Sequence, residues 1–342
     1  MSARLSLLLA AAVFAFASPA GAATFTVNDA GDAGDLTCDA TCTLRDAIDD
    51  ANANGNPGVQ DEIQFSFPGQ AGTPVTIAPT SALPDLTESV LVDGRTHTGA
   101  PGGWGIFLDG SGVASTDYAL DIRSTTPVTI RGLALGGFTN GGALLSSAGI
   151  GVVNTGAAGH VIEDDAIGLR ADGETPAPFE NMHGITTLLA GGTIIRDNVI
   201  GGAEFNGINV DRGSTDTLIR DNRIGTTPGG ASVPNVDGGI RVRSIADGQP
   251  VERTTIRDNL VAGNGRGGIF TFGDERVTAL ERNAILGNAV TYLGIDLGRD
   301  GKVDPIDADG IGDVRGQNRP ELASAGGGEV RGTLTSEPGG TY

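Results

Sequence analysis

The stretch Ile195-Arg-Asp-Asn-Val-Ile-Gly201 recurs without gaps further along the chain, and this repetition decides the fold. The aligned copies are Ile219-Arg-Asp-Asn-Arg-Ile-Gly225, Ile256-Arg-Asp-Asn-Leu-Val-Ala262 and Leu280-Glu-Arg-Asn-Ala-Ile-Leu286, with looser copies beginning at Ile130 and Ile162. A second motif, Gly-Ile followed by alternating residues, lies between the copies, as at Gly207-Ile208 and Gly239-Ile240. Two short strand signals in fixed order, on a basic period of 24 residues (219 − 195) with insertions, predict a solenoid.

A parallel β-helix accounts best for this period. Successive coils would stack about 4.8 Å apart, so that each position pairs with its equivalent above and below. Inward Ile, Leu and Val would form apolar columns, whereas a leucine-rich horseshoe or a propeller would need signatures that are missing here. One turn of each coil carries an asparagine, which tolerates the left-handed conformation and can form an amide ladder between coils. These predicted ladder residues are Asn198, Asn222, Asn259 and Asn283.

The composition supports an all-β chain with many turns. The 342 residues include 56 Gly and 16 Pro, and interior glycines disfavour a helix-rich fold. The glycines keep no third-residue period, which excludes collagen. A formal net charge of −20 should repel nucleic acid and anionic lipid, so we expect neither as a partner.

The first 22 residues have the features of a secretory signal peptide. Arg4 precedes an apolar run over residues 5–17, and Ala20-Gly21-Ala22 is a small-residue cleavage site. The run is shorter than a membrane span, so the sequence predicts no transmembrane segment and a secreted, extracellular or cell-surface protein. In an exported chain the two cysteines, Cys38 and Cys42, are most simply a disulfide, because no nearby residues complete a zinc site.

A single convincing helix follows the second cysteine. Leu44, Ala47, Ile48 and Ala51 form one apolar face, and Thr43 with Asp46 has the spacing of a capping box. A helix of about ten residues is too short to stand alone in water, so its apolar face must pack on something.

The same stretch, Cys42-Thr-Leu-Arg-Asp-Ala-Ile48 followed by Ala51-Asn52, resembles the motif of CSLREA proteins, exported bacterial right-handed β-helix proteins. Asp46 stands where the family has Glu, which keeps the charge and the capping role. The resemblance continues through Val92-Asp-Gly94 and the repeats to Gly294-Ile-Asp-Leu-Gly298. It implies a secreted or surface-displayed right-handed parallel β-helix whose helix and disulfide cap the first coil, with no single assigned reaction.

We therefore expect five segments. They are a signal peptide (1–22), an N-terminal cap (23–70), a β-helix (71–298), an acidic loop (299–320) and the start of a further all-β segment (321–342), which looks truncated. In this last segment, residues 329–336 read as a strand and 337–342 as a turn with the next strand beginning. Two insertions, at residues 169–176 and 226–234, should project from one turn of the solenoid.

Two chemical hypotheses arise from charged residues. Asp164-Asp165 and His183-Gly184 weakly resemble part of the polygalacturonase pattern of carboxylates and histidine. Against this, Asp165 occupies a ladder position and the companion motifs are missing. Arg196, Arg220 and Arg257 recur, each followed by Asp, but such alternation favours solvated ladders of paired charge over a lyase site.

The acidic stretch after the last repeat is a candidate calcium site. Its Asp-x-Asp-Gly-x-x-Asp pattern suits a hard cation, although it lacks the Glu and the flanking helices of an EF-hand, and a solvated acidic loop is the alternative. The candidate ligands are Asp300, Asp304, Asp307, Asp309 and Asp313.

The sequence thus favours a secreted or surface β-helix scaffold, adhesin-like and without catalysis, that binds an extracellular ligand. The expected partner is an extracellular polysaccharide or a host or cell-surface component. The alternative is an extracellular polysaccharide lyase or glycoside hydrolase acting on acidic polysaccharide. An enzyme would need carboxylates and arginines from adjacent coils to converge in a lateral groove, whereas a scaffold would show only ladders.

Overall fold

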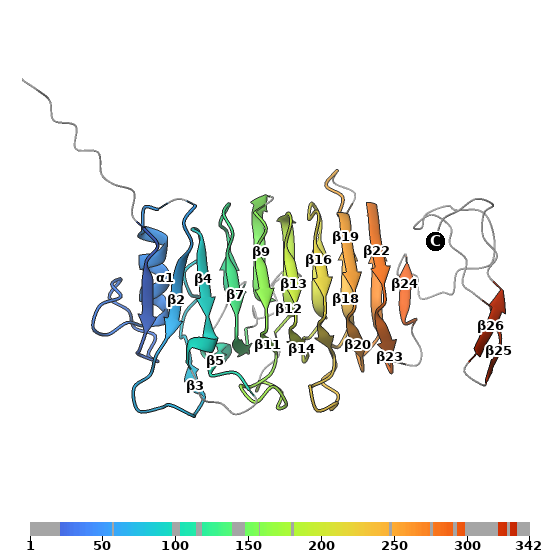
Figure 1. The fold of residues 1–342 in the computed structure, drawn as a ribbon, viewed down its shortest axis with the longest axis horizontal. Helices are drawn as coiled ribbons and strands as arrows, with labels where there is room; N and C mark the ends of the chain where they lie inside the picture. Colours follow the sequence, from blue (N-terminus) through green and yellow to red (C-terminus); the bar gives the residue numbers. More distant parts are fainter. Residues whose placement is uncertain are drawn as a thin grey trace, which may run out of the picture.

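The repeats fold into a right-handed parallel β-helix with one short helix at its N-terminal end, as a computed structural model shows (Figure 1). The structure describes residues 21–56, 58–97, 103–113, 118–138, 148–156, 158–178, 181–245, 248–273, 276–289, 293–297, 321–326 and 329–333. From β4 onwards each coil contributes one strand to each of three parallel sheets, here called A, B and C, in that order along the chain. The predicted fold class is confirmed.

Sheet A is the longest. Its strands are β1 (Thr24–Val27), β2 (Asp61–Phe65), β4 (Val90–Asp93), β7 (Thr129–Arg131), β10 (Val161–Glu163), β13 (Ile194–Arg196), β16 (Leu218–Arg220), β19 (Glu252–Arg257) and β22 (Arg276–Glu281). Sheet B contains β3 (Val75–Ile77), β5 (Ile106–Asp109), β8 (Leu133–Gly136), β11 (Ala166–Ile167), β14 (Val199–Ile200), β17 (Arg223–Ile224), β20 (Leu260–Ala262) and β23 (Ala284–Leu286).

Sheet C carries the candidate site described below. It contains β6 (Tyr118–Ile122), β9 (Ala148–Gly156), β12 (His183–Ala190), β15 (Asn206–Asp211), β18 (Gly238–Arg243), β21 (Gly267–Phe272) and β24 (Ile295–Leu297). Two 3-10 turns, η1 (Gly94–Thr96) and η2 (Gly110–Gly112), follow β4 and β5.

The core consists of stacked aliphatic columns. On sheet A the repeat's first isoleucine pairs in register with its equivalent in the next coil, as Ile162 does with Ile130 and Ile195. On sheet C two inward columns run in parallel, one through Ile185 and Ile208 and one through Val152 and Val210. Because each coil adds the same small apolar set, the chain builds one continuous core with few aromatic residues.

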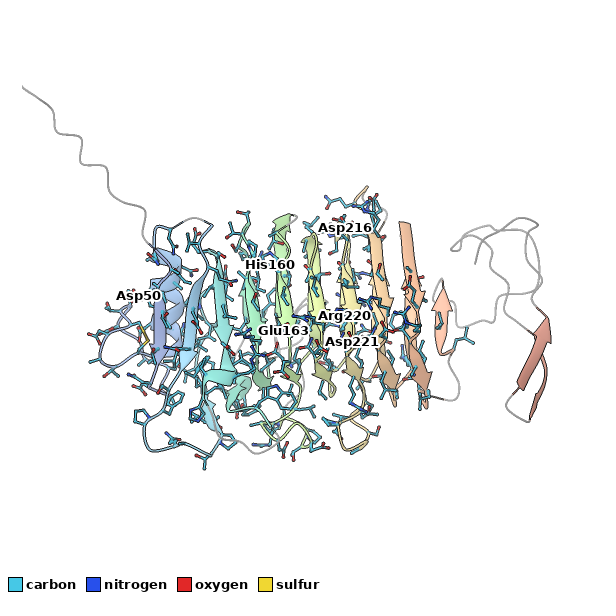
Figure 2. All side chains as sticks on the ribbon, in the orientation of Figure 1. Asp50, His160, Glu163, Asp216, Arg220 and Asp221 are labelled. Carbon is cyan, nitrogen blue, oxygen red and sulfur yellow. A yellow bond between two sulfur atoms is a disulfide. The ribbon has the colours of Figure 1, made fainter. Side chains whose placement is uncertain are left out.

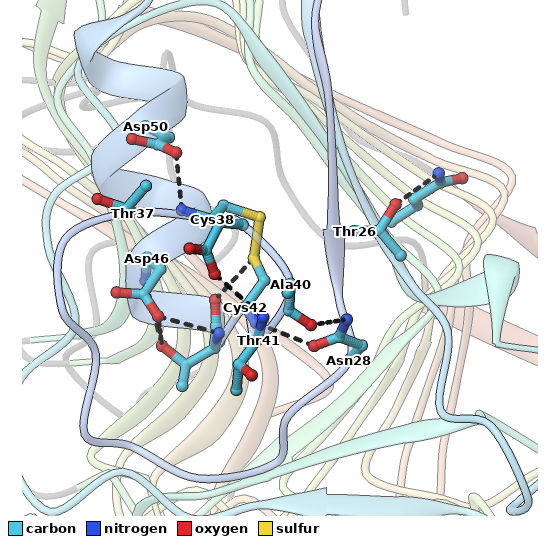
Figure 3. The surroundings of a disulfide bond; sticks show 12 residues. Thr26, Asn28, Thr37, Cys38, Ala40, Thr41, Cys42, Asp46 and Asp50 are labelled. Atoms are coloured by element: carbon cyan, nitrogen blue, oxygen red, sulfur yellow. Dashed lines mark hydrogen bonds between the residues drawn. A yellow bond between two sulfur atoms is a disulfide. The ribbon is translucent and has the colours of Figure 1, made fainter.

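The motif residues after Cys42 form the N-terminal cap. Helix α1 (Leu44–Ala53) buries Leu44, Ala47 and Ile48 in the core, and Thr43 with Asp46 forms the expected capping box. Asp46 also accepts a hydrogen bond from Leu36 N (2.9 Å), so one carboxylate ties the helix start to the preceding loop. A Cys38–Cys42 disulfide lies beside the helix (Figure 3).

Arg45 joins this cap to the solenoid. Its guanidinium pairs with Asp32 (2.6 Å) and donates to the backbone carbonyl of Ala82 (2.7 Å), which lies in the loop after β3. Asp32 in turn accepts from Thr80 N and Oγ1 (2.8 and 2.6 Å). The motif therefore serves structure: its apolar residues fill the core and its charged residues fasten the cap.

Both insertions leave the solenoid at the turn that follows sheet B. The first closes with a bridge between Leu169 and Pro176, and the second with one between Thr226 and Ser232. Glu174 Oε1 of the first accepts from Gly229 N of the second (2.7 Å), so the two loops support each other. Trp104 packs with Leu169 and Val233 in a small apolar cluster on the outer face of sheet B, which these loops cover.

The last described strands, β25 (Glu321–Gly326) and β26 (Glu329–Thr333), form a separate antiparallel pair. The strand expected from residue 329 is therefore present, and it pairs with the segment before it. The acidic stretch that includes Asp300, Asp304, Asp307, Asp309 and Asp313 lies outside the described residues. No helix in the described part of the chain is long and apolar enough to cross a membrane.

Candidate functional site

The outer face of sheet A carries a column of charged side chains. Asp93, Arg131, Glu163 and Arg196 lie on consecutive strands, and Arg131 pairs with Asp93 (2.6 Å) and with Glu163 (3.8 Å). The recurring arginines continue the column, and each contacts the Asp that follows it: Arg196 with Asp197, Arg220 with Asp221, and Arg257 with Asp258 (Figure 2 labels Glu163, Arg220 and Asp221). Every arginine in this column is thus neutralised by a neighbouring carboxylate, which suits a structural ladder of charge.

The predicted asparagine ladder lies in the turn between sheets A and B. Asn222 is typical: its Nδ2 donates to Ile195 O (2.9 Å) and Asn259 Oδ1 (3.0 Å), and its Oδ1 accepts from Asn198 N (3.1 Å). Asn283 closes the described ladder by accepting from Asn259 N (3.1 Å). The left-handed conformation expected of the asparagines is adopted instead by the residues before them: Asp197, Asp221 and Asp258 have φ near +57 to +59°, so the prediction was wrong by one residue.

A second amide ladder, which the sequence analysis missed, lies in the turn between sheets B and C. Asn235 Nδ2 donates to Asn264 Oδ1 (2.8 Å), and Asn264 Nδ2 donates to Asn288 Oδ1 (2.9 Å). Asn181 accepts from Phe138 N at the equivalent position further back. The sequence does contain a pattern for this ladder, because Asn264 and Asn288 each follow an asparagine of the first ladder by five residues. The pattern is hard to recognise because Ala203 stands in the column where an asparagine would be expected.

The outer face of sheet C differs from that of sheet A because its columns change from coil to coil. Between the two inward columns runs an outward column whose members pair in register across neighbouring strands. These members are Asp121, Gly151, Thr186, Asn209, Arg241, Phe270 and Asp296. No residue type repeats in adjacent coils, as expected for a site and unlike a ladder.

Polar groups from two adjacent coils converge at the centre of this face. Arg241 Nε donates to Asn209 Oδ1 (2.8 Å), and Arg243 binds Asp211 through two hydrogen bonds (3.1 and 2.6 Å). Asn209 and Arg241 are buried (0% and 3% exposed) although they point away from the solenoid interior. Such preorganised, buried guanidinium and amide groups are the kind that fix the orientation of a bound ligand.

Two aromatic rings flank this polar centre, each placed by a glycine. A Cβ on Gly151 would lie 2.4 Å from the Tyr118 ring, and one on Gly238 would lie 2.4 Å from the Phe270 ring. Only glycine leaves the space that these rings occupy. Tyr118 also packs with Ala148 and Val153 in an apolar cluster on the same face.

Two of the buried polar atoms without a partner in the described structure lie on the same face. Asn206 Oδ1 and Thr186 Oγ1 are buried, and no hydrogen-bond partner lies within reach of either atom in the described ranges. Asn206 N donates to His183 Nδ1 (3.3 Å), so the ring of His183 is held at the edge of the cluster. Buried polar atoms in folded proteins nearly always have a hydrogen-bond partner, and a bound ligand could supply the partner for these two atoms.

Arginine–aspartate pairs form the margins of the site. Arg123 pairs with Asp121 (2.8 Å) at one margin, and Arg266 pairs with Asp237 (3.1 Å) at the other. The Arg266 side chain is about half exposed (56%), so its guanidinium can meet a ligand arriving from solvent.

The structure does not bring together Asp165 and His183, the residues of the polygalacturonase-like pattern. Asp165 lies in the turn between sheets A and B, whereas His183 begins β12 on sheet C. Among the residues that the structure describes, no group of three or more His, Cys, Asp or Glu side chains could hold a metal ion.

Comparison with solved structures finds other β-helix proteins at low similarity. The Dettilon tailspike protein is 19% identical, with 78% of this chain and 44% of the tailspike covered and a TM-score of 0.40. The A-module of mannuronan C-5 epimerase AlgE6 from Azotobacter vinelandii is 15% identical, with 74% of each chain covered and a TM-score of 0.39. An alginate lyase from Paenibacillus sp. is 14% identical, with 80% of this chain and 99% of the lyase covered and a TM-score of 0.32.

The chain thus spans less than half of the tailspike, and the three sheets themselves establish the fold. No protein-family model matches the sequence, and no curated protein matches it. The resemblance to CSLREA proteins therefore stays a prediction.

Proposed function

We propose that this protein is an exported β-helix scaffold that binds an extracellular polysaccharide on the outer face of sheet C. One observation carries the proposal: aromatic rings, buried amides and arginine–aspartate pairs from consecutive coils meet on that face. On the outer face of sheet A, by contrast, the recurring arginines pair with neighbouring carboxylates. The signal-peptide features and the disulfide support export.

The chemistry of the face suits a carbohydrate. A sugar presents hydroxyls, which bind planar polar groups such as the half-exposed guanidinium of Arg266, while the buried rings of Tyr118 and Phe270 (6% and 4% exposed) fix the shape of the face from beneath. The outward columns of sheet C run along the solenoid axis, so a linear polymer lying along that axis would meet one coil after another. Binding along successive coils would add small contributions over a long surface.

A polysaccharide lyase or hydrolase is the second candidate, and one observation favours it. Asp211 and Arg241, which belong to neighbouring strands, lie within one hydrogen-bonded group through Asn209, which is the convergence that an enzyme requires. Against this, Asp211 is held in a two-bond pair with Arg243. An enzyme would have to release this carboxylate before it could act as an acid, base or nucleophile.

The test is binding of the mature chain to a polysaccharide panel by isothermal titration. We expect Arg266→Ala and Phe270→Leu each to weaken binding at least tenfold. Arg282→Ala is the matched control, because Arg282 is also exposed and paired with an aspartate (2.7 Å), but in the turn after sheet A. Equal binding by all variants, or no binding by the parent protein, would rule out the proposed site.

Release of reducing ends or unsaturated products by the same proteins separates the two candidates. The scaffold should give none. Turnover that is lost in Asp211→Asn while binding persists would replace the scaffold with the enzyme.

A further inference from the structure

Asp165 occupies a position in the first amide ladder where the following coils have asparagine. It aligns with Asn198, Asn222, Asn259 and Asn283, and its backbone N–H donates to Asn198 Oδ1 (3.0 Å), as the ladder requires. Its Oδ1 accepts from Leu133 N (2.8 Å), which matches the acceptor role of an asparagine Oδ1. One oxygen of the carboxyl therefore already behaves as the amide oxygen.

The second oxygen stands where the other rungs have an NH2 group. In those rungs Nδ2 donates to a backbone carbonyl one coil back: Asn198 to Ile162 (3.0 Å), Asn222 to Ile195 (2.9 Å) and Asn259 to Ile219 (3.0 Å). Ile162 pairs with Ile130, so the same register directs Asp165 Oδ2 towards the carbonyl of Ile130. It also directs Oδ2 towards Asn198 Oδ1, by analogy with the bond from Asn198 Nδ2 to Asn222 Oδ1 (3.0 Å). Both neighbours are hydrogen-bond acceptors.

An ionised carboxylate does not fit this position. The Asp165 side chain is completely buried, and no donor in the described ranges reaches its Oδ2. A carboxylate there would face acceptors without water, whereas a protonated carboxyl could donate its O–H to one of them.

The neighbouring carboxylates act in the same direction, and Arg95 opposes them. Asp164 and Glu163 lie beside Asp165 on its own strand and turn, and Arg95 of η1 acts on it from a packed element. Arg95 is shared, since it pairs with Asp93 (3.2 Å) and Asp164 (3.8 Å). The hydrogen-bond partners of Asp165 are uncharged: Leu133 N donates to its Oδ1, and its own backbone N–H donates to Asn198 Oδ1. Burial raises the pKa of Asp165 well above its usual value, and the neighbouring carboxylates add to the effect.

We propose that Asp165 is a protonated carboxylic acid at neutral pH and serves as the first rung of the ladder by donating a hydrogen bond from Oδ2. The folded protein then keeps a proton on Asp165. In the unfolded chain the same carboxyl group loses this proton above its ordinary pKa of 3.8. Folding is therefore coupled to the uptake of one proton over the pH range between that value and the folded-state pKa.

Asp165→Asn supplies the missing N–H permanently and removes the titrating group. Urea unfolding of parent and variant at pH 4.5, 5.5, 6.5 and 7.5 measures the coupling. Relative to the variant, the unfolding constant of the parent should rise about tenfold per pH unit until the folded-state pKa is reached. Asp197→Asn is the matched control, since it makes the same substitution at an exposed turn residue of the next coil, and its effect should not vary with pH in this way.

A ratio of the parent and Asp165→Asn unfolding constants that stays constant over this range would overturn the proposal. Infrared difference spectroscopy at pH 7 gives an independent test that does not depend on unfolding. The C=O stretch of a protonated carboxyl group should be present in the parent protein and missing from Asp165→Asn. A spectrum that shows loss of a carboxylate instead would refute the assignment.

Discussion

Replacing Asn222 with alanine tests whether the first ladder stabilises the solenoid. Asn222 is buried in the middle of the ladder, and its side chain satisfies the backbone N–H of Asn198 and the carbonyl of Ile195. Alanine would leave both groups buried without that partner and would remove two amide–amide bonds, one with Asn198 and one with Asn259. An unsatisfied buried polar group costs about 1–3 kcal/mol, so Asn222→Ala should lower the free energy of unfolding by about 3 kcal/mol. Because the entropy of unfolding is about 2.1 cal/mol/K per residue, the melting temperature should fall by roughly 4–5 °C.

The matched control is Asn283→Ala, at the last described rung. Asn283 makes the same kinds of bond, with Ile256 O (2.8 Å) and Asn259 N (3.1 Å), but it is partly exposed. Water can replace its amide there, so we expect a loss of about 1 kcal/mol. Urea unfolding followed by far-ultraviolet circular dichroism gives both free energies. Equal losses for the two variants, or a loss below about 1 kcal/mol for Asn222→Ala, would refute the argument.

Two further predictions concern His160, which directly precedes β10, and the disulfide of the cap. His160 is buried and neutral, its Nδ1 accepts from Val128 N (3.1 Å), and burial lowers its pKa to about 4. The unfolded chain binds this proton from pH 6.5 downwards. Relative to His160→Asn, the parent protein should therefore lose about 1.4 kcal/mol of stability per pH unit between 6.5 and 4 in urea titrations. The disulfide closes a loop of about five residues, so replacing Cys38 and Cys42 with alanine should lower the free energy of unfolding by about 2 kcal/mol at most. Circular dichroism should show that the β-helix is still folded. An unfolded double variant would contradict this prediction.

The sequence predicts most of the fold because stacking constrains the same positions in every coil. Ile195, Ile219 and Ile256 must each fill the same core column, and Asn198, Asn222 and Asn259 must each satisfy the same turn, so these residues recur at visible spacing. The capping box was also visible, because Thr43 and Asp46 are close in sequence.

The candidate site was missed for the opposite reason. Thr186, Asn209 and Arg241 occupy one outward column of sheet C, but three different side chains at a shared register give no repeat to detect. Their spacing also includes the inserted loops, which hide the register until the sheets are aligned. In a solenoid, repetition therefore reveals the scaffold, and a site has to be sought where the repeats differ.

His160 and Asp165 lie five residues apart in one coil and link folding to pH with opposite signs. His160 has a lowered pKa, so the unfolded state binds more protons between pH 4 and 6.5 and stability rises with pH there. Asp165 has a raised pKa, so the folded state binds more protons above pH 3.8 and stability falls as pH rises. Where the two pH ranges overlap, the two groups change the unfolding constant in opposite directions. Each changes it by up to tenfold per pH unit. The parent protein should then show a flatter pH profile than either His160→Asn or Asp165→Asn, with the two variants sloping in opposite directions.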